Sequence, residues 1–145
     1  MPFSYVRLVQ PVLDQHCVRC HGGEKLEKGL DLTGTAKDGF TRSYWALCGK
    51  SAYGGGSQEP VESFVPRYGG WNSVHQSTPG GAYGARGSRL MQLLRKGHED
   101  VVLSQGELAR IALWIDCNSV FFGVYDPAEQ ARQLSGEIVP LPEVQ

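Results

Sequence analysis

The stretch Cys17-Val18-Arg19-Cys20-His21 decides how this chain is interpreted, because it places two thiols and an imidazole within about one helical turn. Cys-x-x-Cys-His is the pattern of covalent c-type haem attachment, in which both thiols add to vinyl groups at one edge of the porphyrin. The histidine lies four residues after the first cysteine, on the same helical face, and can reach the iron from one side. The stretch predicts a haem anchored by Cys17 and Cys20, with His21 as its first axial ligand.

Two other kinds of site use a Cys-x-x-Cys pair. The pair could be half of a zinc site, with His16 or His21 as a further ligand, or a dithiol redox motif of the thioredoxin kind. A zinc ribbon needs a second close pair, whereas the other cysteines, Cys48 and Cys117, stand far apart. A thioredoxin-like site needs a preceding strand and a βαβ context, which the flanking sequence does not supply. Haem attachment is therefore favoured, and zinc is the next alternative.

Length and charge limit the classes of partner. The chain has 145 residues, enough for one domain with a modest core. Its 14 basic and 15 acidic residues nearly balance, and no basic stripe is visible, so nucleic acid and anionic membranes are not expected partners. No apolar run reaches the length of a transmembrane helix, and the first residues lack the basic and apolar regions of a signal peptide.

Two helices are predicted on either side of a long irregular region. The first contains the motif, because Pro11 suits a first helical turn and Gly22-Gly23 can end the helix. The second is expected from Ser88, a preferred N-cap residue, to Lys96, with Gly97 at the position after its end.

A third helix has the clearest signature. Ser104-Gln105-Gly106-Glu107 is a capping box, and Leu103 and Leu108 occupy the positions of a hydrophobic staple. A helical apolar stripe follows and predicts an inward face; it consists of Leu108, Ile111, Ala112 and Ile115.

The region between the first two helices is rich in glycine yet carries many aromatic residues, unlike a disordered linker. We expect 49–87 to be an ordered loop insertion that packs on the core or on the haem edge. Residues 1–126 are predicted as a monohaem domain and 127–145 as a peripheral tail or linker, with a short helix over 129–134.

The candidates for the second axial ligand are Met1, His16, His75, Met91 and His98. His16 adjoins the motif and cannot swing to the opposite haem face, and Met91 suits core packing on its helix. His75 stays possible in the glycine-rich loop. His98 lies on a short connector between two anchored helix ends, which gives the positional control that ligation needs. The predicted iron ligands are therefore His21 and His98.

Two segments resemble the beginning and end of the cytochrome c domains in large planctomycete-type secreted proteins. The first reads Pro11-x-Leu13-x-x-x-Cys17-x-x-Cys20-His21-Gly22 and then Gly29-Leu30-Asp31-Leu32; the second reads Ser88-x-Leu90, then Gly97-His98-Glu99-Asp100-Val101-x-Leu103-Ser104, and closes with Trp114-Ile115-Asp116. They are also similar to the haem domain at the carboxyl end of hydrazine synthase alpha subunit-like proteins. The resemblance covers residues 10–33 and 87–118.

The resemblance implies an all-α, cytochrome c-like fold, with three core helices around a covalent haem and 49–87 as a long irregular insertion. Many relatives carry a Met-Pro-Pro ligand segment before the last helix, and here only His98 is a strong ligand type in that connector. Haem attachment in these proteins is linked to export, so a periplasmic or otherwise exported protein is expected, in mature form or as an excised domain. Cys48 and Cys117 would then be available as one disulfide, the alternative being two separate buried thiols.

These features predict a low-spin haem c of low potential that transfers electrons, serving a redox partner protein or a parent enzyme. The alternative is a five-coordinate haem that binds or transforms a small molecule, with the aromatic loop as its cover. A zinc-stabilised interaction module is the third possibility.

Overall fold

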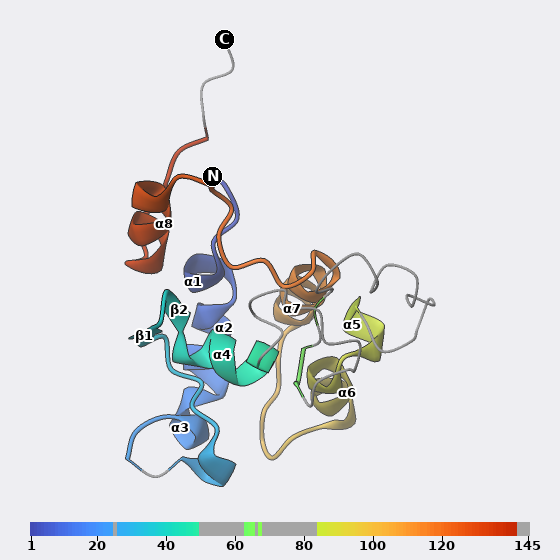
Figure 1. Ribbon diagram of the computed structural model, residues 1–145. Coiled ribbons are helices and arrows are strands. Elements are labelled where there is room, and N and C mark those ends of the chain that lie inside the picture. Colours follow the sequence, from blue (N-terminus) through green and yellow to red (C-terminus); the bar gives the residue numbers. More distant parts are fainter. Residues whose placement is uncertain (25, 50–62, 66, 68–83, 142–145) are drawn as a thin grey trace.

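The computed structural model describes residues 1–24, 26–49, 63–65, 67 and 84–141, and these are mostly helical (Figure 1). The predicted α-rich class is confirmed, while the finer cytochrome c-like arrangement stays a prediction. The helices are α1 Tyr5–Leu8, α2 Gln10–His16, α3 Val18–His21, α4 Arg42–Cys48, α5 Gly84–Gly87, α6 Arg89–Lys96, α7 Gln105–Asp116 and α8 Pro127–Leu134, with a 3-10 turn at Glu27–Gly29. Strands β1 Ala36–Lys37 and β2 Phe40–Thr41 form an antiparallel hairpin.

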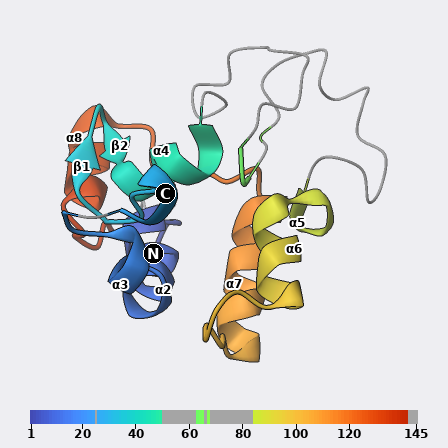
Figure 2. The ribbon, with the colours of Figure 1, turned by 90° about the horizontal axis from the view of Figure 1, so that it is seen from below.

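The helices fall into two groups that lie side by side. One holds α1 to α4, the hairpin and α8, and the other holds α5, α6 and α7 (Figure 2). Buried aromatic rings join the groups, since the Tyr5 ring lies 5.2 Å from Trp114 of α7, 5.2 Å from Tyr44 of α4 and 5.0 Å from Phe121, between ring centres. Such ring pairs add specific geometry to a large buried apolar area.

A buried polar network fixes α2 within the first group. Gln10 is 3% exposed, and its amide donates to the Leu32 carbonyl oxygen at 3.0 Å and to Asp14 Oδ1 at 2.8 Å. Its side-chain oxygen accepts a hydrogen bond from Ser43 of α4, whose Oγ also accepts one from the Tyr5 hydroxyl at 3.1 Å. Buried polar groups of this kind hold their partners in one arrangement, because breaking any bond leaves an unpaired group.

The second and third predicted helices are confirmed. Ser88 caps α6 by accepting a hydrogen bond from the Met91 N–H, and Gly97 follows the helix with φ +99°, a value that favours glycine. The capping box of α7 is complete, because Ser104 Oγ accepts from the Glu107 N–H while Glu107 accepts from the Ser104 N–H.

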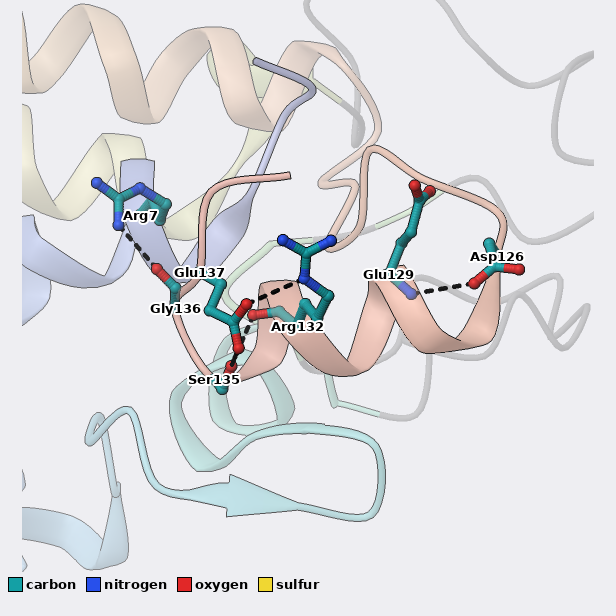
Figure 3. Close-up of polar contacts among 7 residues, drawn as sticks. All are labelled: Arg7, Asp126, Glu129, Arg132, Ser135, Gly136 and Glu137. Carbon is teal, nitrogen blue, oxygen red and sulfur yellow. Dashed lines mark hydrogen bonds and ion pairs between the residues drawn. The ribbon is translucent and has the colours of Figure 1, made fainter. Parts of the chain in front are cut away.

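Helix α8 confirms the short helix expected within the tail. Asp126 caps it by accepting hydrogen bonds from the Ala128 N–H and from the Glu129 N–H, the second of which is drawn in Figure 3. Its buried Gln133 donates to the Phe3 carbonyl oxygen at 2.9 Å, and Arg7 of α1 donates to the Gly136 carbonyl oxygen at 2.7 Å. The segment after residue 126 therefore packs against the first residues of the chain.

Two local elements were not predicted. The hairpin turns at Asp38-Gly39, with φ of 47° and 81°, an Asp-Gly pair typical of tight hairpin turns. Helix α4 begins after Thr41, whose Oγ1 accepts a hydrogen bond from the Tyr44 N–H at 3.3 Å. Much of the glycine-rich region, including residues 50–62 and 68–83, lies outside the described residues. No helix in the described ranges is long and apolar enough to span a membrane.

The turn after α3 has no room for a side chain at Gly22. A Cβ placed there would lie 2.6 Å from Val18 Cγ1 and 2.9 Å from the Val18 carbonyl oxygen, although its φ of −151° suits any residue. We expect Gly22→Ala to lower the free energy of unfolding by about 1–3 kcal/mol, the usual cost of overpacking. Urea unfolding followed by circular dichroism measures this change.

Gly106→Ala is the matched control. A Cβ at Gly106 of α7 meets nothing within 4 Å, and alanine favours helix over glycine, so the free energy of unfolding should rise by up to about 1 kcal/mol. Equal stability of Gly22→Ala and the unsubstituted chain would contradict the close approach at the turn.

Candidate functional site

A cavity of about 440 Å³ lies where the two groups of helices face each other. This volume is within the range of about 300–1,000 Å³ that is usual for small-molecule and cofactor sites. One wall comes from α2, α3 and the segment after them, and the other from α6 and the connector 97–104. The apolar part of the lining includes Leu32, Leu47, Phe64, Leu90, Leu94 and Val101.

All four residues predicted to hold haem, namely Cys17, Cys20, His21 and His98, line this cavity. Their elements are far apart in sequence, since the motif lies at the junction of α2 and α3 and His98 lies beyond α6. The structure therefore brings the predicted anchors and both predicted ligands to one space.

The motif does not lie in one uninterrupted helix as predicted. Cys17 separates α2 from α3, with φ −118°, well away from the helical value of about −63°. The helical hydrogen-bond pattern still crosses the junction, because the Cys17 N–H donates to the Leu13 carbonyl oxygen at 2.8 Å and the His21 N–H to that of Cys17 at 3.0 Å. The predicted end of the helix at Gly22 is confirmed.

The chain after the motif returns along the cavity. The Leu32 N–H donates to the His21 carbonyl oxygen at 2.7 Å, which holds the end of α3 against buried Leu32. Asp31 accepts hydrogen bonds from the Thr33 N–H at 3.0 Å and from Arg42 at 3.1 Å. Leu30 and Leu32 of this stretch thus line the cavity.

His98 lies on a tight turn at the start of the connector 97–104. The Val101 N–H donates to the His98 carbonyl oxygen at 3.1 Å, and Glu99 between them has φ +51°. Gly97 ends α6 just before this turn, and Ser104 caps α7 just after it. The backbone of His98 is therefore fixed from both sides.

The His21 and His98 rings have the separation that a shared metal requires. Their centres lie 6.1 Å apart, with 19° between their planes. A metal between two imidazoles needs ring centres about 6 Å apart, because each metal–nitrogen bond is about 2 Å and each nitrogen lies about 1 Å from its ring centre. The distance between the two ring centres is therefore compatible with two imidazoles that bind one metal.

One ring nitrogen of His21 lacks a hydrogen-bond partner among the described residues. This nitrogen, Nδ1, is buried. A buried unpaired polar atom costs about 1–3 kcal/mol. Because Nδ1 has almost no accessible surface, the ring nitrogen of His21 that is left for a bound group is Nε2.

The other ligand candidates have different surroundings. His16 lies at the end of α2, and its Nε2 is 2.9 Å from Glu107 Oε1. Met91 is 2% exposed in the core, the packing role favoured for it, and Met1 is 52% exposed. His75 lies outside the described residues.

Two polar contacts join the motif helices to the connector and to α7. His16 of α2 bonds to Glu107 of α7, and the two side chains are 16% and 17% exposed. Arg19 of α3 pairs with Asp100 of the connector, and these side chains are 66% and 69% exposed. Neither pairing could be deduced from sequence, although the capping box singled out Glu107.

The Cys17 thiol does not have the character of a reactive dithiol site. Burial, with a smaller effect of Cys20, raises the pKa of Cys17 to about 11, whereas reactive cysteines have lowered pKa values.

Within the described residues, no three His, Cys, Asp or Glu side chains are grouped as a metal ion would need. Axial ligation of haem iron needs only two protein ligands.

The structure shows no disulfide among the four cysteines, all of which it describes. Cys48 is completely buried in α4, and Cys117 is exposed at the end of α7. Their disulfide stays a prediction.

Comparison of the chain with protein-family models, with curated proteins and with solved structures finds no match.

The His16–Glu107 contact predicts a loss of stability in acid. The hydrogen bond from His16, followed by those from Ser104, lowers the pKa of Glu107 from 4.5 to about 2. The stability that this carboxylate contributes is fully present above about pH 4.5 and is lost as the pH falls toward 2. We expect Glu107→Gln, which can keep a capping box, to flatten this part of the dependence of unfolding free energy on pH.

Urea unfolding at a series of pH values measures this effect. Glu24→Gln, at an exposed position of the loop after α3, is the control and should leave the acid limb unchanged. If the unfolding free energy of Glu107→Gln fell as steeply below pH 4.5 as that of the unsubstituted chain, the lowered pKa of Glu107 would be contradicted.

Proposed function

We propose that this chain binds one covalent haem c in the cavity and transfers single electrons to or from a partner protein. The observation that carries the proposal is the His21–His98 pair, with ring centres 6.1 Å apart, in a cavity that both motif cysteines also line.

Each residue has a distinct role in this proposal. Cys17 and Cys20 anchor the porphyrin, and His21 and His98 are the axial ligands. When bound, the haem supplies a one-electron iron couple whose potential depends on its axial ligands. Two histidine ligands leave no open position for a substrate, which favours electron transfer over catalysis. Histidine in place of a thioether ligand also favours a lower potential.

The apolar lining supports the same function. Burial of a porphyrin against side chains such as Leu32, Leu47 and Leu94 would remove apolar surface from water on both partners. Charged residues of both signs, Arg19, Glu27, Glu99 and Asp100, also border the cavity. The proposal includes a redox partner or parent enzyme as electron donor or acceptor, and an exported location, where such haems are attached.

Covalent attachment is tested by producing the chain in a host competent for c-type haem maturation. We expect haem to stay with the polypeptide on a denaturing gel and to add its mass in mass spectrometry. Replacement of both motif cysteines, Cys17→Ser with Cys20→Ser, should abolish covalent haem. Cys117→Ser, at an exposed cysteine outside the cavity, should retain it. An unsubstituted chain without haem bands would overturn the proposed function.

Axial ligation is tested by visible spectra of the oxidised and dithionite-reduced chain. We expect sharp low-spin bands that carbon monoxide does not change. His98→Ala should give a high-spin spectrum that shifts with carbon monoxide, because it opens one axial position. His16→Gln, which can still bond to Glu107, should keep the low-spin spectrum.

A high-spin spectrum in the unsubstituted chain would remove His98 as a ligand. The five-coordinate alternative, with binding or conversion of a small molecule, would then be the function to test.

A further inference from the structure

His16 directly precedes Cys17 and contacts α7, which belongs to the other group of helices. Its Nε2 lies 2.9 Å from Glu107 Oε1, although the residues are 91 positions apart in sequence. Both side chains are largely shielded, at 16% and 17% exposure, and a hydrogen bond in such surroundings is less weakened by water than one at the surface.

The second carboxylate oxygen of Glu107 accepts hydrogen bonds from Ser104, at the end of the connector. Glu107 Oε2 accepts hydrogen bonds from the Ser104 N–H and from Ser104 Oγ, both at 2.7 Å. Ser104 is the last residue of the connector 97–104 that carries His98. One carboxylate therefore ties the end of α2 to the end of this connector.

The connector is short and locally rigid, so a constraint at its end reaches His98. The hydrogen bond from the Val101 N–H to the His98 carbonyl oxygen closes a turn, and only Val102 and Leu103 separate this turn from Ser104. Loss of the His16–Glu107 hydrogen bond would therefore let the turn that carries His98 move relative to His21.

We propose that His16 is a positioning residue, which acts through Glu107 to hold the connector so that His98 stays at the ligand position. This inference rests on the function proposed above. It assigns to His16 a role that is separate from ligation, and it predicts that His98 leaves that position more often when His16 is removed.

The Arg19–Asp100 pair provides an internal comparison. It joins α3 to the same connector, but its side chains are 66% and 69% exposed. Ion pairs that exposed stabilise little, because water and salt screen them. The inference therefore predicts a clear effect for His16 and a small one for Arg19.

The first experiment measures carbon monoxide binding to the reduced, haem-loaded chain. Carbon monoxide binds only when His98 is away, so its apparent affinity rises in proportion to that fraction. We expect His16→Ala to tighten the apparent affinity about tenfold, the change expected for loss of one hydrogen bond. His16→Gln, which restores a donor to Glu107, and Arg19→Gln should each stay within about twofold of the unsubstituted chain.

The second experiment follows hydrogen exchange of the amides in 97–104 by mass spectrometry. His16→Ala should accelerate exchange in this segment, and His16→Gln should not. Asp126→Ala removes the N-cap of α8 (Figure 3) and controls for a general loss of stability. It should change neither the exchange of the connector nor carbon monoxide affinity.

The outcomes separate this inference from the proposed function. Low-spin haem in every variant, with unchanged carbon monoxide affinity and exchange in His16→Ala, overturns the positioning role alone. Equal effects in His16→Ala and Asp126→Ala also overturn it, because any loss of stability would then release the connector. A chain without haem overturns the proposed function and the inference with it.

Discussion

The contact of Tyr5 with Trp114 and Phe121 is the constraint on which the rest of the structure depends. It joins α1, near the beginning of the chain, to α7 and the segment after it, with ring centres 5.2 and 5.0 Å apart. The Tyr5 N–H also donates to the Phe121 carbonyl oxygen at 3.0 Å. This junction sets where the two groups of helices meet, and the cavity lies between them.

Hydrogen bonds around Gln10 then fix the orientation of the motif. Gln10 ties α2 to Leu32 and to Ser43, so that the helix leading to Cys17 cannot rotate independently of the cavity wall. On the other side, caps at Ser88 and Ser104 fix α6 and α7. The His21–His98 separation is thus a product of several contacts remote from either ring.

Features that depend on neighbouring residues could be predicted from the sequence. The N-caps at Ser88 and Ser104, the glycine at 97 and the short helix in the tail all follow from local capping and conformational rules. Contacts between distant segments could not be predicted, because no periodicity indicates which residues meet. His16–Glu107 is the clearest case, since each residue has an ordinary local role and only the fold brings them together.

The candidate site also has features that the sequence indicates and features that only the structure shows. The chemistry proposed for Cys17, Cys20 and His21 is inferred from their spacing, and the proposed role of His98 from its place on a short connector. That His21 and His98 face one cavity needed the structure, as did the break in the helix at Cys17. The Asp-Gly pair at 38–39 is itself typical of a hairpin turn, whereas helix α4 has only its Thr41 cap as a local indication.

The distance in sequence between the two walls of the cavity has a consequence for the order of folding. The motif wall has many contacts within residues 1–48, such as those of Gln10 and His21 with Leu32, whereas the His98 wall joins it only through contacts between residues far apart in sequence. Loop closure over such a separation is slow and entropically costly, while local helices form early. Cys17 and Cys20 would therefore stand in a formed turn before the second wall completes the cavity that they line, and would be accessible at that stage to the haem proposed above.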